Sequence, residues 1–312
     1  MTRKILIFFL ITSLHASISG AADMLTYDGS AVIVRYPSAL GGAATGLVRS
    51  YPGVRSDLET KLGWKADFVP LVILIRRNSE FGKLTGAENE LVTAFAVPAQ
   101  NLIVMDYSKL EKNPFDVDAT LEHELCHLLL HRHVHSPPKW LDEGVAQWAS
   151  GGMADIIDPG HKDILKQMSL ADRLIPLQDL SVSFPDKPRS FLLAYEESKS
   201  FVEYVAHKYG AERLRAALHL MEKGESADRA LSNTVGLDLT ALQDRWRGDL
   251  RRRYSWPSYL ANNLFWLLFF LAALVTLIGY VQAKRRLKNY RDEDDEFSGD
   301  VIHRDDKDDK ME

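Results

Sequence analysis

The chain has 312 residues, enough for one large domain or two modest ones once its ends are set aside. Apolar residues make up 46% of it and charged residues 26%, which is ordinary for a soluble globular protein and assigns no function by itself. The net charge is −5, and no basic cluster with interleaved aromatic residues is present, so we expect no nucleic-acid partner. A single cysteine, Cys126, excludes an intrachain disulfide.

The first 22 residues have the pattern of a secretory signal peptide. Arg3 and Lys4 form a basic start, residues 5–11 form a compact apolar run, and the small residues 20–22 offer a cleavage site. An uncleaved anchor helix is the alternative, but the apolar run is short for crossing a bilayer. We therefore expect residues 1–22 to be removed and the following domain to be exported.

A second and longer hydrophobic segment lies near the C-terminus. Residues 255–283 contain no charged side chain, and their almost wholly apolar part, 264–281, matches the roughly 20 residues that a membrane-spanning helix needs. Aromatic residues near both ends, among them Trp266 and Tyr280, favour the headgroup regions of a bilayer. The sequence predicts one transmembrane helix at 260–282.

The residues after this span favour a cytoplasmic C-terminus. Lys284, Arg285, Arg286 and Lys288 follow it directly, and basic residues collect on the cytoplasmic side of membrane helices. Basic residues before the span weaken this signal, but export of the preceding domain gives the same orientation. The last 22 residues hold eleven Asp or Glu against four Lys or Arg. We expect 283–312 to be an acidic, disordered cytoplasmic tail.

Between the two ends, the pattern is that of an α+β protein, with a β-rich N-terminal part at 23–115 and a helical part at 116–255. A helical spacing at 47–62 is interrupted by Pro52 and Gly53. Strands are predicted at 32–36, 68–76, 91–97 and 102–107. Helices are predicted at 118–132, 137–149, 161–170, 190–209, 211–222 and 238–253.

An H-E-x-x-H motif, His-Glu-Leu-Cys-His at 123–127, carries the chemistry. Positions four apart lie on one face of a helix, so His123 and His127 can point at one metal ion. Zinc suits such a site, because imidazole is a good zinc ligand and three protein ligands leave the fourth position to water. Glu124 can take a proton from that water as general base. Asp118 is the expected N-cap of the helix. The alternative is an amphipathic helix that carries the histidines by chance.

Two residues could complete the metal site. His133 lies where the H-E-x-x-H-x-x-G-x-x-H pattern has its third histidine, but Leu130 occupies the position of the glycine that this pattern needs. Glu143 lies on a second helix, for which we expect Ser136 as N-cap and Pro137 as first residue. A carboxylate that returns on this helix can face both histidines, and the missing glycine favours Glu143 over His133.

The run at 123–127, followed by Trp-Leu-Asp-Glu-Gly at 140–144, resembles the gluzincin branch of the zincin metallopeptidases, in particular the bacterial peptidase MA-like domains. The segment 194–204 is similar to the one that follows the zinc-binding helices in that family. The resemblance covers 65–252 and implies a thermolysin-like fold, with an active-site helix under a small sheet. It also implies that the edge strand of the sheet, here around 102–105, aligns an extended peptide.

Two further residues follow from this resemblance. Many gluzincins have an acidic residue four positions after the ligand glutamate, where it orients a ligand histidine. Gln147 stands there in this chain, and its amide oxygen could accept the same hydrogen bond. Tyr195 is a candidate for stabilising the oxyanion through its hydroxyl group, with a core aromatic residue as the alternative.

Other residues near the motif have simpler interpretations. His131, His133 and His135 could bind a second metal, but a solvated end of the helix is our expectation. Asp142 is expected to be exposed or to cap a helix. Cys126 is expected to be a buried, inert thiol.

The sequence therefore predicts a membrane-anchored zinc metallopeptidase that acts on peptides or proteins outside the cytoplasm. A Zn²⁺ ion is expected on His123, His127 and Glu143, with Glu124 and Tyr195 in catalysis. The alternative is a catalytically silent zincin fold that binds partners at the membrane.

Overall fold

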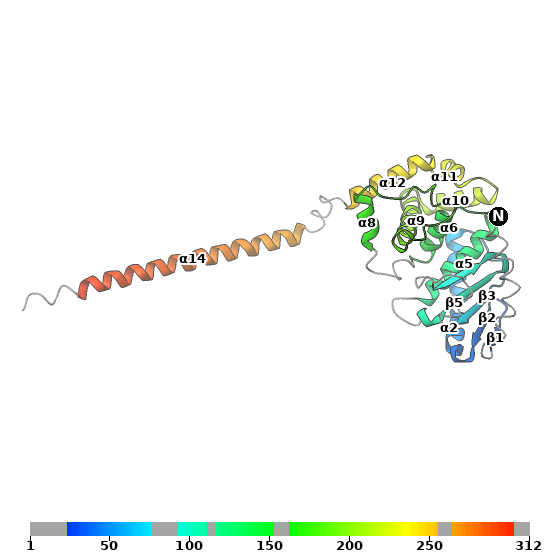
Figure 1. Ribbon diagram of the computed structural model, residues 1–312, viewed down its shortest axis with the longest axis horizontal. Helices are drawn as coiled ribbons and strands as arrows, with labels where there is room; N and C mark the ends of the chain where they lie inside the picture. The colour runs from blue at the N-terminus through cyan, green and yellow to red at the C-terminus, as the bar shows by residue number, and fades with distance from the viewer. Residues whose placement is uncertain (1–23, 77–92, 111–115, 153–161, 255–263, 303–312) are drawn as a thin grey trace, which may run out of the picture. The chain divides into compact units, whose positions relative to one another are not determined.

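The computed structural model describes residues 24–76, 93–110, 116–152, 162–254 and 264–302 (Figure 1). The predicted signal peptide lies outside the described residues. The chain divides into two compact units, one up to Arg251 and one from Arg252 onward. The first unit combines one sheet with a helix-rich second half, which confirms the expected order of a β-rich part followed by a helical part.

The sheet of the first unit has five strands in the spatial order β1-β2-β3-β5-β4. The strands β2, β3 and β5 run parallel to one another, whereas β1 pairs antiparallel with β2 and β4 pairs antiparallel with β5. The strands are β1 (Met24–Asp28), β2 (Ile33–Pro37), β3 (Leu71–Ile75), β4 (Ala94–Val97) and β5 (Leu102–Asp106). Among these, β1 was not predicted from the sequence.

The expectation that the strand around 102–105 forms an edge is wrong. All five residues of β5 are buried, and β5 lies between β3 and β4. Its sequence, Leu-Ile-Val-Met-Asp, is a continuous apolar run rather than an alternating one, and such runs belong to strands that are covered on both faces. The strand at this edge of the sheet is β4 instead.

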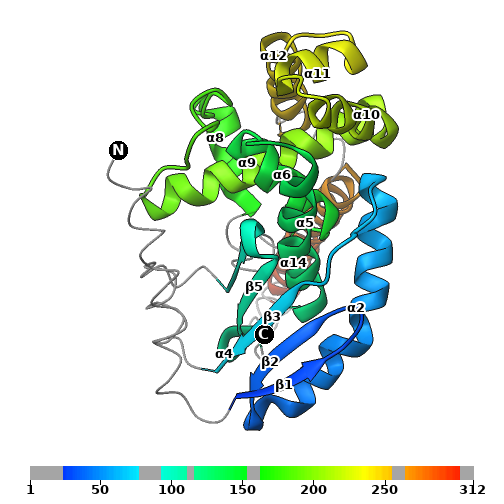
Figure 2. The ribbon, with the colours of Figure 1, turned by 90° about the vertical axis from the view of Figure 1, so that its right-hand side faces the viewer.

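Two helices pack against the sheet and against each other (Figure 2). Helix α2 (Gly41–Leu62) lies on β2, and helix α5 (Val117–His133) lies on β4 and β5. The expected interruption at Pro52 is absent, because α2 runs through it as one helix. Buried residues line one face of α2 both before and after Pro52, so packing outweighs the tendency of proline to interrupt a helix. These buried residues are Ala44, Leu47, Tyr51, Leu58 and Leu62.

The helix-rich half begins with α6, which packs against α5 on one side and α9 on another. Its helices are α6 (Lys139–Ala149), α8 (Lys162–Leu170), α9 (Pro188–Tyr209), α10 (Ala211–Glu222), α11 (Ala227–Val235) and α12 (Leu239–Tyr254). Short helical turns occur at η2 (Ser38–Leu40), η3 (Pro98–Gln100) and α4 (Tyr107–Leu110). The sequence predicted these long helices except α11.

The contact between α6 and α9 is unusually close at Gly144. A Cβ atom at this position would lie 2.5 Å from the carbonyl oxygen of Ser198 and 2.6 Å from Cγ2 of Val202. Because one of these neighbours is backbone, the helices would have to move apart to accept a side chain. The glycine therefore sets the depth at which α6 enters the fold.

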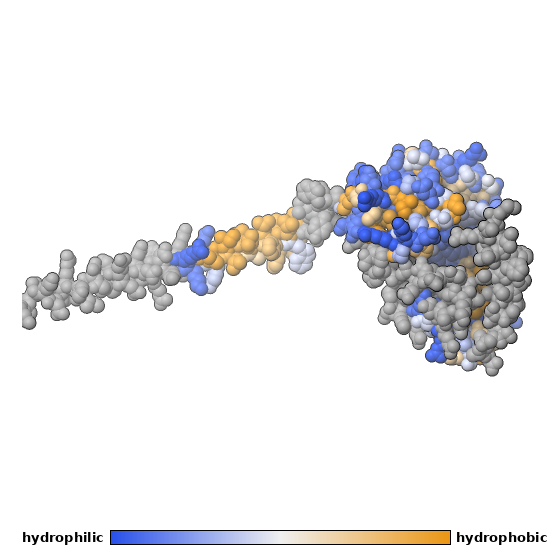
Figure 3. Space-filling view, viewed as in Figure 1, coloured by the Kyte–Doolittle hydropathy of each residue, from blue (hydrophilic) through white to orange (hydrophobic). Residues whose placement is uncertain are grey.

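The second unit contains helix α14 (Leu264–Ile302). Its part from Leu264 to Arg285 is 22 residues long and contains an 18-residue stretch with a mean hydropathy of 2.5, which by length and composition is enough to cross a membrane. Figure 3 shows this apolar surface, followed by a hydrophilic band. The helix continues to Ile302, into the segment expected to be disordered, and the charged residues there are mostly good helix formers.

The close contact at Gly144 generates a prediction. Gly144→Ala should lower the free energy of unfolding by about 1–3 kcal/mol, because the methyl group overpacks the α6–α9 contact. Thermal unfolding of the full chain in detergent would measure this loss. Gly46→Ala is the matched control, since a Cβ atom in that helical position meets nothing within 4 Å. It should be neutral or slightly stabilising, and equal losses in both variants would contradict the packing argument.

Candidate metal centre

Helix α5 brings the H-E-x-x-H motif into the interior of the protein. The N-cap is Asp116, not Asp118 as predicted, and its carboxylate accepts hydrogen bonds from the backbone N–H groups of Asp118 and Ala119 at 2.8 and 3.0 Å. Each residue from Thr120 to Leu130 is buried. The motif is therefore surrounded by protein rather than placed on a solvated helix face.

Helix α6 begins later than predicted and is capped by a distant segment. It starts at Lys139 after Pro138, without a side-chain cap, so the expected roles of Ser136 and Pro137 are wrong. The backbone N–H groups of Lys139 and Trp140 donate instead to the carbonyl oxygens of Ser181 and Leu180, at 2.8 and 3.1 Å. Sequence spacing could not reveal this cap, because it comes from 40 residues further along the chain.

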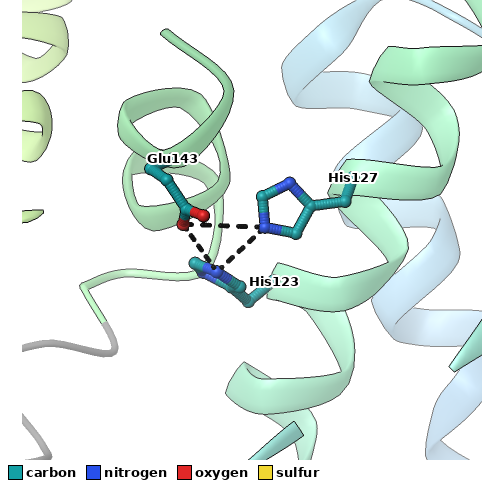
Figure 4. A group of neighbouring side chains, drawn as sticks. All are labelled: His123, His127 and Glu143. Atoms are coloured by element: carbon teal, nitrogen blue, oxygen red, sulfur yellow. Dashed lines mark hydrogen bonds and ion pairs between the residues drawn. The ribbon is translucent and has the colours of Figure 1, made fainter. Parts of the chain in front are cut away.

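His123, His127 and Glu143 point toward one another from α5 and α6 (Figure 4). The Nε2 atoms of His123 and His127 lie 3.2 Å apart. The Oε2 atom of Glu143 lies 3.5 Å from Nε2 of His123 and 3.7 Å from Nε2 of His127. All three side chains are buried. The structure thus brings together the three residues for which the sequence predicts metal binding.

The geometry of this cluster fits a zinc ion. Ligand atoms that surround zinc tetrahedrally at their usual distances lie about 3.3 Å from each other, close to the three separations found here. In the described part of the chain, Oε2 of Glu143 is buried without a hydrogen-bond partner. A buried carboxylate oxygen without a partner is costly, and a cation between it and the two imidazoles removes that cost.

A second group of polar residues contacts the cluster at the ring nitrogen of His127 that faces away from Glu143. The expectation that Asp142 is exposed or caps a helix is wrong, because Asp142 is buried and its Oδ1 lies 2.7 Å from Nδ1 of His127. Its Oδ2 lies 3.3 Å from Nε2 of His131. A carboxylate on the far nitrogen of a histidine fixes the ring and leaves Nε2 facing the cluster. The need of a ligand histidine for such an acceptor was the signal that could have identified Asp142.

Gln147 does not take the supporting role considered for it. Its amide nitrogen donates to the backbone carbonyl of Tyr195 at 3.1 Å, and its amide oxygen has no hydrogen-bond partner among the described residues. Gln147 therefore ties α6 to α9, whereas Asp142 contacts the histidine. Sequence reasoning also missed Lys139, whose Nζ lies 2.6 Å from Oε1 of Glu143.

A cavity of about 690 Å³ opens beside the cluster, and both Glu124 and Tyr195 line it. Its opposite walls include β4 residues such as Phe95 and, from the helical half, Phe191 and the exposed Val182. The Tyr195 ring packs against aromatic neighbours, with its centroid 4.8 Å from that of Phe191. Tyr195 is thus both a member of an aromatic cluster and part of the cavity wall.

The electrostatic field in the cluster is negative. Burial opposes a charge on Glu143, but the nearby ammonium of Lys139 and the two histidines outweigh it and lower the pKa of this carboxyl well below its usual range. Burial likewise opposes a charge on His127, but Asp142 and Glu143 outweigh it and raise its pKa to about 9. A negative electrostatic potential that holds a proton on His127 also favours a metal cation in place of that proton.

The two candidate catalytic groups have raised pKa values. Burial raises the pKa of Glu124 most, although the neighbouring histidines oppose this effect. Burial also raises the pKa of Tyr195 well above its usual value, and the Glu143 and Glu124 carboxylates add to the shift. A carboxyl with a raised pKa is better matched to proton transfer near neutral pH, and Tyr195 keeps its hydroxyl proton there.

His133 lies outside the cluster and belongs to a different contact. It is the last residue of α5, its Nδ1 lies 2.7 Å from Oε1 of Glu222, and its ring stacks on Trp64 at 4.6 Å. These contacts join α5 to α10 and to the residues that follow α2. We expected His133 to lie at a solvated helix end, but it takes part in an interhelical contact.

Two histidines and a carboxylate held by two buried helices, beside a cavity and a small sheet, are an arrangement typical of metal-dependent hydrolases. The sequence matches the family model of the Peptidase MA superfamily over residues 80–252, which is more than half of the chain. The chain belongs to this superfamily. No curated protein matches the sequence.

Among solved structures, the M1 zinc metallopeptidase from Deinococcus radiodurans matches 74% of this chain, with 17% identity and a TM-score of 0.44. Aminopeptidase A of Legionella pneumophila matches 72% with 14% identity and a TM-score of 0.41, and yeast LTA4 hydrolase matches 78% with 10% identity and a TM-score of 0.44. These matches cover 51%, 27% and 42% of the respective chains, so this chain spans about half or less of each length.

The separation of Glu143 from His133 generates a prediction. Glu143→Ala should weaken zinc binding by more than the roughly 10–100-fold that the loss of a supporting residue costs, because two imidazoles alone retain the ion poorly. His133→Ala should leave zinc content unchanged in the folded protein, because its ring contacts Glu222 and Trp64 instead. Metal analysis after dialysis against a chelator would measure both. Zinc lost from the His133 variant and kept by the Glu143 variant would reverse the assignment.

Proposed function

We propose that this protein is a zinc metallopeptidase with a thermolysin-like arrangement, in which His123, His127 and Glu143 hold the ion. The convergence of these three side chains to within 4.8 Å inside a Peptidase MA superfamily domain is the observation that carries the proposal. A bound zinc ion would supply Lewis acidity toward water and a peptide carbonyl group. The reaction class is hydrolysis of peptide bonds.

Glu124 is the proposed general base. It is buried in the cavity wall next to His123, and its raised pKa suits a group that takes and returns a proton. Its carboxylate would accept a proton from the attacking water and deliver it to the nitrogen of the departing amine. No other carboxyl group among the described cavity residues is free for this work, since Asp142 contacts His127 and Glu143 contacts Lys139.

Tyr195 is the proposed hydrogen-bond donor to the carbonyl oxygen that becomes negative during attack. Its proton stays on the hydroxyl group at neutral pH, because burial and two nearby carboxylates raise its pKa. The packing of its ring against Phe184, at 5.0 Å, and Phe191 holds the hydroxyl in place. A purely structural aromatic residue is the alternative, which Tyr195→Phe would distinguish by retaining full activity.

An extended peptide is the proposed substrate form. Residues 93–96 of the β4 region line the cavity, and β4 is an edge strand of the sheet. A strand at the edge of a sheet can bind another extended chain through backbone hydrogen bonds, without regard to side-chain identity. The peptide would then pass between β4 and the proposed metal site.

We further propose that the peptidase domain is exported and anchored by one membrane span. The 22-residue apolar part of α14 supports the span by length and composition. The proposed order is a signal peptide at 1–22, an exported domain with parts at 23–115 and 116–255, a span at 260–282, and a cytoplasmic tail at 283–312. The basic residues Lys284 and Arg285 favour this orientation.

A catalytically silent zincin fold that binds partners at the membrane is the second candidate. It would use the same cavity for binding only. The first candidate is favoured because Glu124, which a binding protein does not need, lies in the cavity wall beside the cluster.

The role of Glu124 generates a prediction. Glu124→Gln should keep about one zinc per chain but lower kcat/KM by roughly 10²–10⁴-fold. The side-chain amide of glutamine occupies the same space as the carboxylate but does not take up a proton. Cleavage of a peptide library by the zinc-loaded full chain in detergent would provide the assay. Equal cleavage by variant and parent would remove Glu124 from the mechanism, and no cleavage by the zinc-loaded parent would favour the silent candidate.

The orientation of the span generates a second prediction. Protease added to the outside of intact cells should degrade the domain and leave an epitope on the tail at 283–312 protected, because the bilayer separates them. Immunoblotting with tags at both sites would detect the fragments. Loss of the tail epitope from unbroken cells would contradict this orientation.

A further inference from the structure

Lys139 makes contacts that the proposed mechanism does not yet use. Its Nζ lies 2.6 Å from Oε1 of Glu143 and 3.7 Å from Oδ2 of Asp142. The Glu143 side chain is 4% exposed, so this ammonium is paired with a buried carboxylate. The two oxygens of Glu143 therefore have different neighbours, because Oε1 contacts Lys139 and Oε2 faces the two histidines.

The position of Lys139 in its helix is unfavourable by local rules. It is the first residue of α6, where the positive end of the helix dipole repels a cation. Lysine four residues before glutamate is also the weaker order for a pair on one helix. What Lys139 gains in this position is its contact with two buried carboxylates, one of which belongs to the cluster, so its placement follows from the site and not from helix preference.

The backbone of Lys139 is fixed as well. Its N–H group donates to the carbonyl oxygen of Ser181 at 2.8 Å, and Ser181 lines the same cavity. The side chain therefore extends from an anchored point toward Glu143, four residues further along the helix. This geometry holds one carboxylate oxygen away from the cluster and turns the other into it.

We propose that Lys139 is a positioning residue that restricts Glu143 to a single metal-facing oxygen. The proposal rests on the function proposed above. Without the ammonium, the Glu143 carboxylate could rotate and present both oxygens, which would fill the position that water and the substrate carbonyl need. Lys139 thus keeps the site open by acting on Glu143.

The test uses the full chain in detergent, loaded with Co²⁺ in place of Zn²⁺, because the visible bands of Co²⁺ weaken when a fifth ligand joins four. Lys139→Met should weaken these bands and lower kcat/KM of the zinc form by roughly 10–100-fold, mainly through kcat. Lys139→Arg should retain the parent spectrum, since it keeps a cation near Oε1. The matched control is Lys208→Met, which removes an ion pair with Asp249 on α9 and α12, outside the cavity lining. It should match the parent in both measurements.

Two results would overturn the proposal, and they are distinguishable. Parent-like Co²⁺ bands in a folded Lys139→Met variant would remove the positioning role and leave the zinc peptidase proposal intact. A parent chain that takes up no stoichiometric metal would overturn both proposals together. If Lys139→Met does not fold, Lys139→Gln can be used in the same test, because it also removes the positive charge. Loss of metal from either folded neutral variant counts with the first of these results, because a carboxylate that presents both oxygens should retain the ion.

Discussion

The close packing of α6 against both α5 and α9 is the constraint on which the candidate site depends. Gly144 lets α6 approach the backbone of α9, and the residue before it, Glu143, then reaches the two histidines of α5 at 3.5 and 3.7 Å. A shift of α6 by the width of one methyl group would change these separations, which lie close to those between the ligands of one zinc ion. The geometry of the centre therefore depends on the contact of Gly144 with α9 as well as on the three residues of the cluster.

The buried charges of the cluster favour a bound cation. Glu124, Asp142 and Glu143 contribute three carboxyl groups to the cavity wall, and Lys139 is the lysine among its described residues. Buried carboxylates in excess of their cations destabilise a fold unless a proton or a metal ion compensates them. The raised pKa of His127 reflects this excess. Metal binding and folding stability are expected to be linked for the same reason.

Local patterns in the sequence predicted much of this arrangement, and long-range contacts account for what they missed. The spacing of His123 and His127 follows from the helical period, and most strand and helix positions follow from apolar patterns. The cap of α6 by the 180–181 segment, the contact of Asp142 with a histidine and the central place of β5 each depend on residues distant in sequence. Capping rules do not contain that information, so the expected cap at Ser136 was wrong, and the edge strand around 102–105 that the family resemblance implied was also wrong.

The backbone cap of α6 has a consequence for how this enzyme class could diversify. The carbonyl groups of Leu180 and Ser181 satisfy the first N–H groups of the helix that carries Glu143, and the same segment lines the cavity through Ser181 and Val182. A loop exchange that alters selectivity at this wall would also disturb the helix start. Replacement of the exposed Val182 side chain would change the cavity wall alone, whereas an insertion or deletion in this segment would also displace the start of α6 and with it Glu143.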